Sequence, residues 1–291
     1  MRKAVSCLLA GLSIWAAGAA TRADDASTYT LRYRFHPGET LRWAVEHRSM
    51  IDTTVSGSSQ TAETFSRSLK AWRVQDVQPD GSATFVHSVE SVEMRQKLAG
   101  CEEVRYNSRT DPQPPVGFRQ VARSVGVPLS TVTLDARGNI LRRTREQVKA
   151  AASEGQITVP LPQQPVPVGY TWSFPHEIDV KTNTGLIRKV KARQTFTLQS
   201  VKTGVATIGV ATQILTPVDD PAIESQLIER ASSGTVRFDI DAGRVIAQQM
   251  DLDKRLVGYP NPASSIHYLT RFTEKLLPAE VETASRSEEL R

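Results

Sequence analysis

Two stretches of the chain read alike: Gly38-Glu39-Thr40-Leu41-Arg42-Trp43 and Gly169-Tyr170-Thr171-Trp172-Ser173-Phe174. In each, a glycine precedes a run in which apolar and polar residues alternate. Two further pairs of hairpin blocks match in the same order, around Gly81 and Gly204 and around Gly138 and Gly243. Blocks that return in one order indicate a tandem duplication. The sequence therefore predicts two similar units.

Outward from these blocks, much of the chain shows the two-residue period of β-strands. Between Thr30 and Phe35, for example, apolar side chains occupy every second position, which predicts a strand. His36-Pro37-Gly38-Glu39 then has the composition of a turn. Long alternating runs joined by short glycine turns are typical of antiparallel meanders.

Two segments have the pattern of helices instead. Thr144 and Gln147 form a capping box before an alanine-rich run at 146–153. Asp220 precedes Pro221 and a stripe of apolar residues that should lie on a sheet face, namely Ile223, Leu227, Ile228 and Ala231. We predict a mainly β (α+β) fold of two tandem similar units of long antiparallel strands, each with one helix. A sandwich, a half-barrel and a helix-backed sheet all fit, and the units either share one sheet or form separate lobes.

The beginning of the chain is typical of a secretory signal peptide, because Arg2-Lys3 precedes an uncharged apolar run at 4–20 and then small residues. No later segment is apolar enough to cross a bilayer. We expect an exported protein, periplasmic or extracellular. The predicted segments are a signal peptide at 1–23, β-rich unit 1 at 24–155, a Pro-rich linker at 156–167, β-rich unit 2 at 168–277 and a disordered tail at 278–291.

Charge and cysteine content narrow the classes of partner. Loss of the signal lowers the basic count by three, from 36 to 33, against 31 acidic residues, so the net charge is close to neutral. Basic clusters at 142–149 and 188–193 lack interleaved aromatic residues, which argues against a nucleic-acid partner. Cys101 is the one cysteine left after cleavage, and it is either a free thiol or a partner in an intermolecular disulfide.

Three motifs resemble an uncharacterised family of exported bacterial proteins. They are Pro37-Gly38-Glu39, Asp80-Gly81-Ser82-Ala83-Thr84, and Leu161-Pro162 with Pro165-Val166-Pro167-Val168-Gly169-Tyr170-Thr171-Trp172. The resemblance covers nearly the whole chain after the signal and implies an exported, β-rich protein. The family has no assigned activity, so the resemblance implies no functional residues.

Signatures of catalysis and metal binding are scarce. No Gly-x-Ser-x-Gly elbow and no phosphate-binding glycine loop occurs, and the five histidines are scattered. Lys202-Thr203-Gly204 matches a penicillin-binding-enzyme tripeptide but occupies a predicted turn. Asp239-Ile240-Asp241-Ala242-Gly243 begins like a calcium loop but lacks its later ligands. We predict no catalytic residue, no metal site and no cofactor. Whether the protein is an enzyme stays open, and the scarcity of signatures argues against catalysis.

The remaining candidates are aromatic residues and one thiol. Trp43, Trp72 and Trp172 either anchor the core of each unit or line an apolar groove. Our first hypothesis is a non-enzymatic envelope or extracellular interaction module that binds an unknown protein or envelope component. The second is a periplasmic carrier of an apolar ligand such as a lipid or lipoprotein. The third is a hydrolase or redox protein that uses Cys101.

Overall fold

The computed structural model describes residues 27–145 and 157–279 and confirms a mainly β fold. The helical segments are short: η1 (Val116–Phe118), α1 (Arg119–Ala122), α2 (Pro221–Leu227) and η2 (Ile228–Ala231). The strands are β1 (Thr28–Tyr29), β2 (Thr40–Val55), β3 (Ser58–Val77), β4 (Ala83–Leu98), β5 (Val104–Asn107), β6 (Pro128–Leu134), β7 (Ile140–Arg145), β8 (Val166–Pro167), β9 (Thr171–Lys181), β10 (Ile187–Lys202), β11 (Val205–Ile214), β12 (Ser233–Asp239), β13 (Arg244–Val257) and β14 (Ser265–Leu276).

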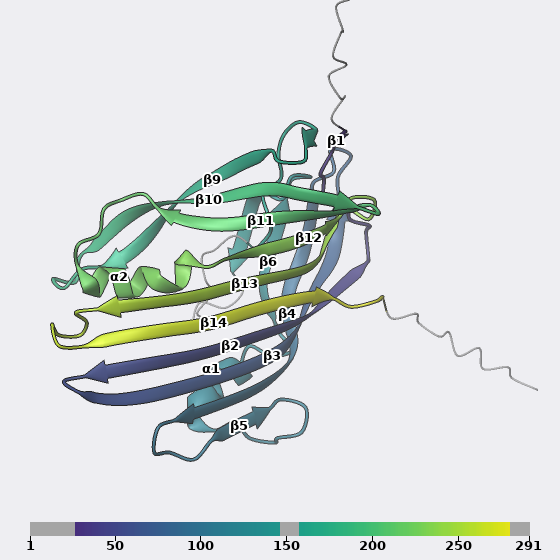
Figure 1. The fold of residues 1–291 in the computed structure, drawn as a ribbon. Helices are drawn as coiled ribbons and strands as arrows, with labels where there is room; N and C mark the ends of the chain where they lie inside the picture. The colour runs from purple at the N-terminus through teal and green to yellow at the C-terminus, as the bar shows by residue number, and fades with distance from the viewer. Residues whose placement is uncertain (1–26, 146–156, 280–291) are drawn as a thin grey trace, which may run out of the picture.

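The two predicted units share one sheet. Its strands follow the order β7-β6-β4-β3-β2-β14-β13-β12-β11-β10-β9, and β5 pairs with β4 beside this path. The units meet where β2 pairs with β14 in antiparallel register, from Trp43 opposite Leu276 to Thr54 opposite Ser265. Figure 1 shows this sheet curling so that the strands of one unit lie across from those of the other. Of the arrangements that the sequence left open, separate lobes are therefore excluded.

The glycine turns lie where the matched blocks predict them. Positive φ angles occur at all six glycines, namely Gly38 (82°), Gly81 (82°), Gly138 (81°), Gly169 (90°), Gly204 (75°) and Gly243 (63°). Residues with a Cβ rarely adopt this left-handed conformation, so the glycines fix the turns in place. The turn interpretation of Lys202-Thr203-Gly204 is confirmed, because the segment connects β10 with β11. The tandem duplication itself stays a prediction.

The prediction of a strand from Thr30 to Phe35 was wrong. The segment is extended, and Leu31, Tyr33 and Phe35 are buried, but it pairs with no strand within residues 27–145 and 157–279. Its backbone bonds go to turns instead: the Tyr33 amide donates to Ala136 O at 2.8 Å, and the next amide donates to Gly243 O at 2.9 Å. When one side of an extended segment is buried, apolar and polar residues alternate whether its backbone forms hydrogen bonds with a neighbouring strand or with separate turns.

The main core closes one end of the curled sheet. Trp72, Phe85 and Val132 from the first unit join Phe196 and Phe238 from the second in one buried cluster. The described part of the predicted Pro-rich linker, residues 157–167, packs into this core. Its buried side chains are Val159, Pro160, Leu161, Pro162 and Val166, and β8 within it pairs with β1.

Short helices cover two smaller clusters farther along the sheet. α2 begins as predicted, with Asp220 Oδ1 accepting from the Ala222 amide at 2.8 Å, and its Ile223 and Leu227 pack on Val180 of β9. In the first unit, the segment between β4 and β6 contains β5 and η1. Together with α1 it covers Val92 of β4. The helix predicted at 146–153, the signal peptide and nearly all of the tail lie outside the described residues.

Candidate functional site

A cavity of about 270 Å³ lies where the closed core gives way to the open part of the sheet. We call the side of the sheet that carries Trp43 and Trp72 the inner face. The rings of these two residues, on the adjacent strands β2 and β3, lie 4.8 Å apart between centroids. The remaining lining is mainly apolar and comes from both units, from the segment at 33–35 and from the segment at 157–159. The apolar members are Tyr33, Phe35, Leu41, Ile157, Val159, Phe196, Val210, Val236, Val245, Met250 and Phe272.

An ion pair lies in this apolar lining. Lys70 of β3 reaches over β2 to Glu274 of β14, and only 16 % of the lysine side chain and 6 % of the glutamate side chain are exposed. Gln248 Nε2 of β13 donates to the second carboxylate oxygen, Glu274 Oε2, at 2.8 Å. The Lys70 ammonium lies 4.6 Å from the ring centroid of Trp43 and 5.0 Å from that of Trp72. Two indole faces and one carboxylate thus surround a single ammonium group, and the Gln248 amide holds that carboxylate.

The strand periodicity explains this arrangement. Trp43 lies opposite Lys70, while Glu274 lies opposite both Val45 and Gln248, so all five side chains share the inner face. Burying two charges costs more than their attraction returns unless their geometry is good, and apolar replacements of such pairs are often as stable. Stability alone therefore gives little reason for a charged pair at this place.

His87 completes the polar surroundings of Lys70. It lies on β4 opposite Trp72, and its Nδ1 is buried with no hydrogen-bond partner in the parts of the chain that the structure describes. Burial, together with the positive charges of Lys70 and Arg143, lowers the pKa of His87 to about 4. The imidazole is consequently neutral at neutral pH and adds no charge to the site.

The structure brings together two of the three predicted tryptophans. Trp172 does not line the cavity: its Nε1 donates to Pro160 O at 2.6 Å, and its ring stacks on Phe196 at 5.7 Å. Cys101 is exposed in the turn between β4 and β5 and is absent from the cavity lining. Within 27–145 and 157–279, no group of three or more His, Cys, Asp and Glu side chains could hold a metal ion.

Sequence reasoning missed Lys70 and Glu274, although a signal for both is present. Each is a charged residue in phase with the apolar side of its strand: Lys70 is two residues from Trp72, and Glu274 is two residues from Phe272 and from Leu276. A charge at such a position is rarely buried without a partner. The partner could not be named, because the two residues are 204 positions apart in the chain.

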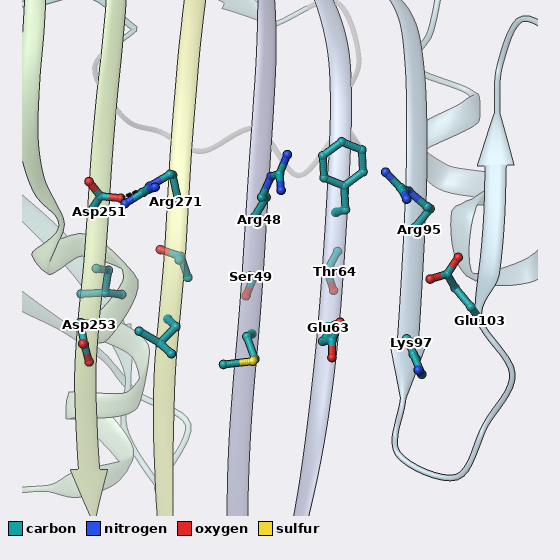
Figure 2. A pocket seen from close by; sticks show the side chains of 15 residues that line it. Arg48, Ser49, Glu63, Thr64, Arg95, Lys97, Glu103, Asp251, Asp253 and Arg271 are labelled. Atoms are coloured by element: carbon teal, nitrogen blue, oxygen red, sulfur yellow. Dashed lines mark hydrogen bonds and ion pairs between the residues drawn. The ribbon is translucent and has the colours of Figure 1, made fainter.

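A larger hollow of about 620 Å³ lies on the outer face, the opposite side of the sheet. Figure 2 shows Asp251, Arg271, Arg48 and Arg95 side by side across neighbouring strands. Arg271 Nε donates to Asp251 at 2.6 Å, and the guanidinium groups of Arg48 and Arg95 lie 5.3 and 4.4 Å from the ring centroid of Phe65. The charged lining comprises Arg48, Lys97, Arg95 and Arg271 against Glu63, Glu103, Asp251 and Asp253. The four positive and four negative side chains balance, and the Arg271–Asp251 ion pair links β14 to β13 within the hollow.

Comparisons with known proteins leave the family of the chain open. No protein-family model and no curated protein matches the sequence. A solved structure on lipid–protein interactions in lipovitellin has a TM-score of 0.45 at 12% identity, over 84% of this chain and 26% of that one. The chain thus spans about a quarter of the lipovitellin chain.

Two other solved structures are less similar. DynF, from the dynemicin biosynthesis pathway of Micromonospora chersina, has a TM-score of 0.21 at 7% identity, over 91% of this chain and 92% of that one. A DUF1329 family protein from Desulfovibrio piger has a TM-score of 0.15 at 9% identity, over 82% and 86%. Likeness at these levels does not decide function. Among the described residues, no helix has the length and apolar character needed to cross a membrane.

Proposed function

We propose that the chain is an exported carrier that binds an apolar ligand in the inner-face cavity. The observation that supports this most is the aromatic and aliphatic lining, in which Trp43 and Trp72 stand next to a nearly buried ion pair. Ligand sites are typically apolar hollows with a few placed polar groups, which is the composition of this cavity. Export rests on the predicted signal peptide at 1–23.

The volume limits how much of a ligand the cavity encloses. One water molecule takes ~30 Å³ in the liquid, so a cavity of about 270 Å³ holds roughly nine groups of that size. This suits a segment of an acyl chain or one small ring system. A longer chain would continue along the inner face, where β13 leads from Met250 past Leu252 toward a second hollow of about 290 Å³ beneath α2 and η2.

This proposal places the second of the three hypotheses drawn from the sequence ahead of the first. A plain interaction module gives no reason for an apolar cavity with a charged pair in it. A hydrolase or redox protein that uses Cys101 would have its thiol on an exposed turn, apart from the cavity. The carrier hypothesis accounts for the aromatic lining and the polar group together.

Binding of N-phenyl-1-naphthylamine, a neutral dye that fluoresces in apolar sites, tests the proposal. Ser232 lines the cavity, so Ser232→Trp should fill it and weaken dye binding about tenfold or more. Thr273→Trp adds the same ring at an outer-face position next to Phe272 and should bind the dye as the wild type does. Equal binding by both variants, or no binding by the wild type, would reject the proposal.

A further inference from the structure

The Lys70–Glu274 pair selects the chemical class of the ligand, an inference that rests on the proposed function. We infer that the ligand is a chain amphiphile whose polar group is a neutral hydrogen-bond acceptor, namely an ester or amide carbonyl. Lys70 is the more accessible member of the pair, at 16 % exposure against 6 % for Glu274. An ammonium group carries three donors, and the carboxylate takes one of them.

The carboxylate itself offers little to a ligand. Glu274 Oε1 already accepts from Lys70, and Glu274 Oε2 accepts from Gln248. The pair therefore offers a ligand in the cavity the remaining N–H donors of the Lys70 ammonium group. A ligand atom that approaches Lys70 must be an acceptor, and the carbonyl oxygen of an ester or amide is a small acceptor that can stay attached to an apolar chain.

The charge balance of the site disfavours ionised ligands. Lys70 cancels Glu274, and Arg244, the other charged side chain in the lining, is paired with Glu39 at 3.0 Å. A free carboxylate would be attracted by Lys70 and repelled by Glu274 while losing its hydration. An alkylammonium would meet Lys70, a like charge, with no free acceptor at hand. A neutral carbonyl gains the hydrogen bond without either penalty.

The two tryptophans provide an apolar surface for the acyl chain of the ligand next to its carbonyl group. Because Lys70 lies against the indole faces of Trp43 and Trp72, a carbonyl bound to Lys70 lies beside these rings, and its adjoining carbons can pack on them. Phe272 and Met250 continue the apolar lining on the neighbouring strands. The site thus matches an acyl ester or acyl amide rather than a hydrocarbon without a polar group.

A ligand series of equal chain length tests this inference through displacement of N-phenyl-1-naphthylamine. The series is methyl decanoate, N-methyldecanamide, decanoate, decylamine and decane, with chains of about ten carbons to suit the cavity. The ester and the amide should bind about tenfold tighter than the other three compounds. In the double variant Lys70→Met/Glu274→Leu, the affinity for the ester should fall to that for decane.

A matched double variant on the outer face provides the control. Arg271→Met/Asp251→Leu removes another cross-strand ion pair and should keep the ester preference. Equal affinity of all five ligands for the wild type would overturn the inference and leave the carrier proposal standing, and so would tightest binding of decanoate. Failure of the dye and of every ligand to bind would reject both proposals. Because the series is measured on the wild type, its outcome does not depend on whether the variants fold.

Discussion

Removal of one member of the Lys70–Glu274 pair should destabilise the fold far more than removal of both. Lys70→Met leaves a carboxylate that is 6 % exposed and whose remaining hydrogen-bond partner among the described residues is the Gln248 amide. Breaking a buried pair from one side typically costs about 3–5 kcal/mol, whereas its replacement by apolar side chains of similar volume is often neutral or stabilising. Lys70→Met/Glu274→Leu should therefore be about as stable as the wild type.

Thermal unfolding followed by tryptophan fluorescence and by circular dichroism measures these differences. In a chain of this size, ~1 kcal/mol corresponds to about 2–4 °C in Tm, so Lys70→Met should melt roughly 10 °C below the wild type. The double variant should recover most of that loss and should still lack the preference for esters. A double variant that is as unstable as the single one would refute the view that the pair is retained for binding rather than for stability.

Three further outcomes concern His87, Gly138 and Phe238. The pKa of His87 falls to about 4 in the folded state from 6.5. The stabilisation that depends on neutral His87 is therefore complete above pH 6.5 and declines by about 3 kcal/mol as the pH falls toward 4. A His87→Gln variant should lose that part of the acid sensitivity in urea titrations at several pH values. Gly138→Ala should cost about 2–4 kcal/mol, because its Cβ would lie 2.5 Å from the Tyr33 ring at a φ of 81°. Gly57→Ala, with a φ of 86° and open space, should cost only about 1 kcal/mol, and equal losses at the two glycines would contradict the packing described. Phe238→Ala, at a fully buried position, should cost about 3–5 kcal/mol by calorimetry, and a loss near zero would count against a core shared by both units.

Local features of the sequence predicted much of the fold. The glycine turns followed from positions such as Gly81 and Gly204, because a positive φ is a property of the residue itself. The start of α2 followed from Asp220 and Pro221, which satisfy and preset the first helical turn without help from distant residues.

Features that depend on distant partners could not be predicted in the same way. The pairing of β2 with β14 joins the two ends of the chain, and no local pattern distinguishes it from separate sheets. The segment at 30–35 has strand periodicity, yet its backbone partners are turns more than a hundred residues away. The candidate site also depends on distant partners. Trp43 and Trp72 were recognised as aromatic candidates, but Lys70 and Glu274 become a pair only when β14 lies against β2.

Fluorescence quenching by a bromine-labelled acyl ester tests the carrier proposal most directly, because bromine quenches only the tryptophans that it touches. Trp172→Phe retains the two cavity tryptophans, whereas Trp43→Phe/Trp72→Phe retains Trp172, whose indole bonds Pro160 outside the cavity. With equal occupancy established by dye displacement, a ligand in the inner-face cavity should give strong quenching in the first variant and little in the second. Equal quenching in both variants, or quenching of Trp172 alone, would place the ligand elsewhere and contradict the carrier proposal.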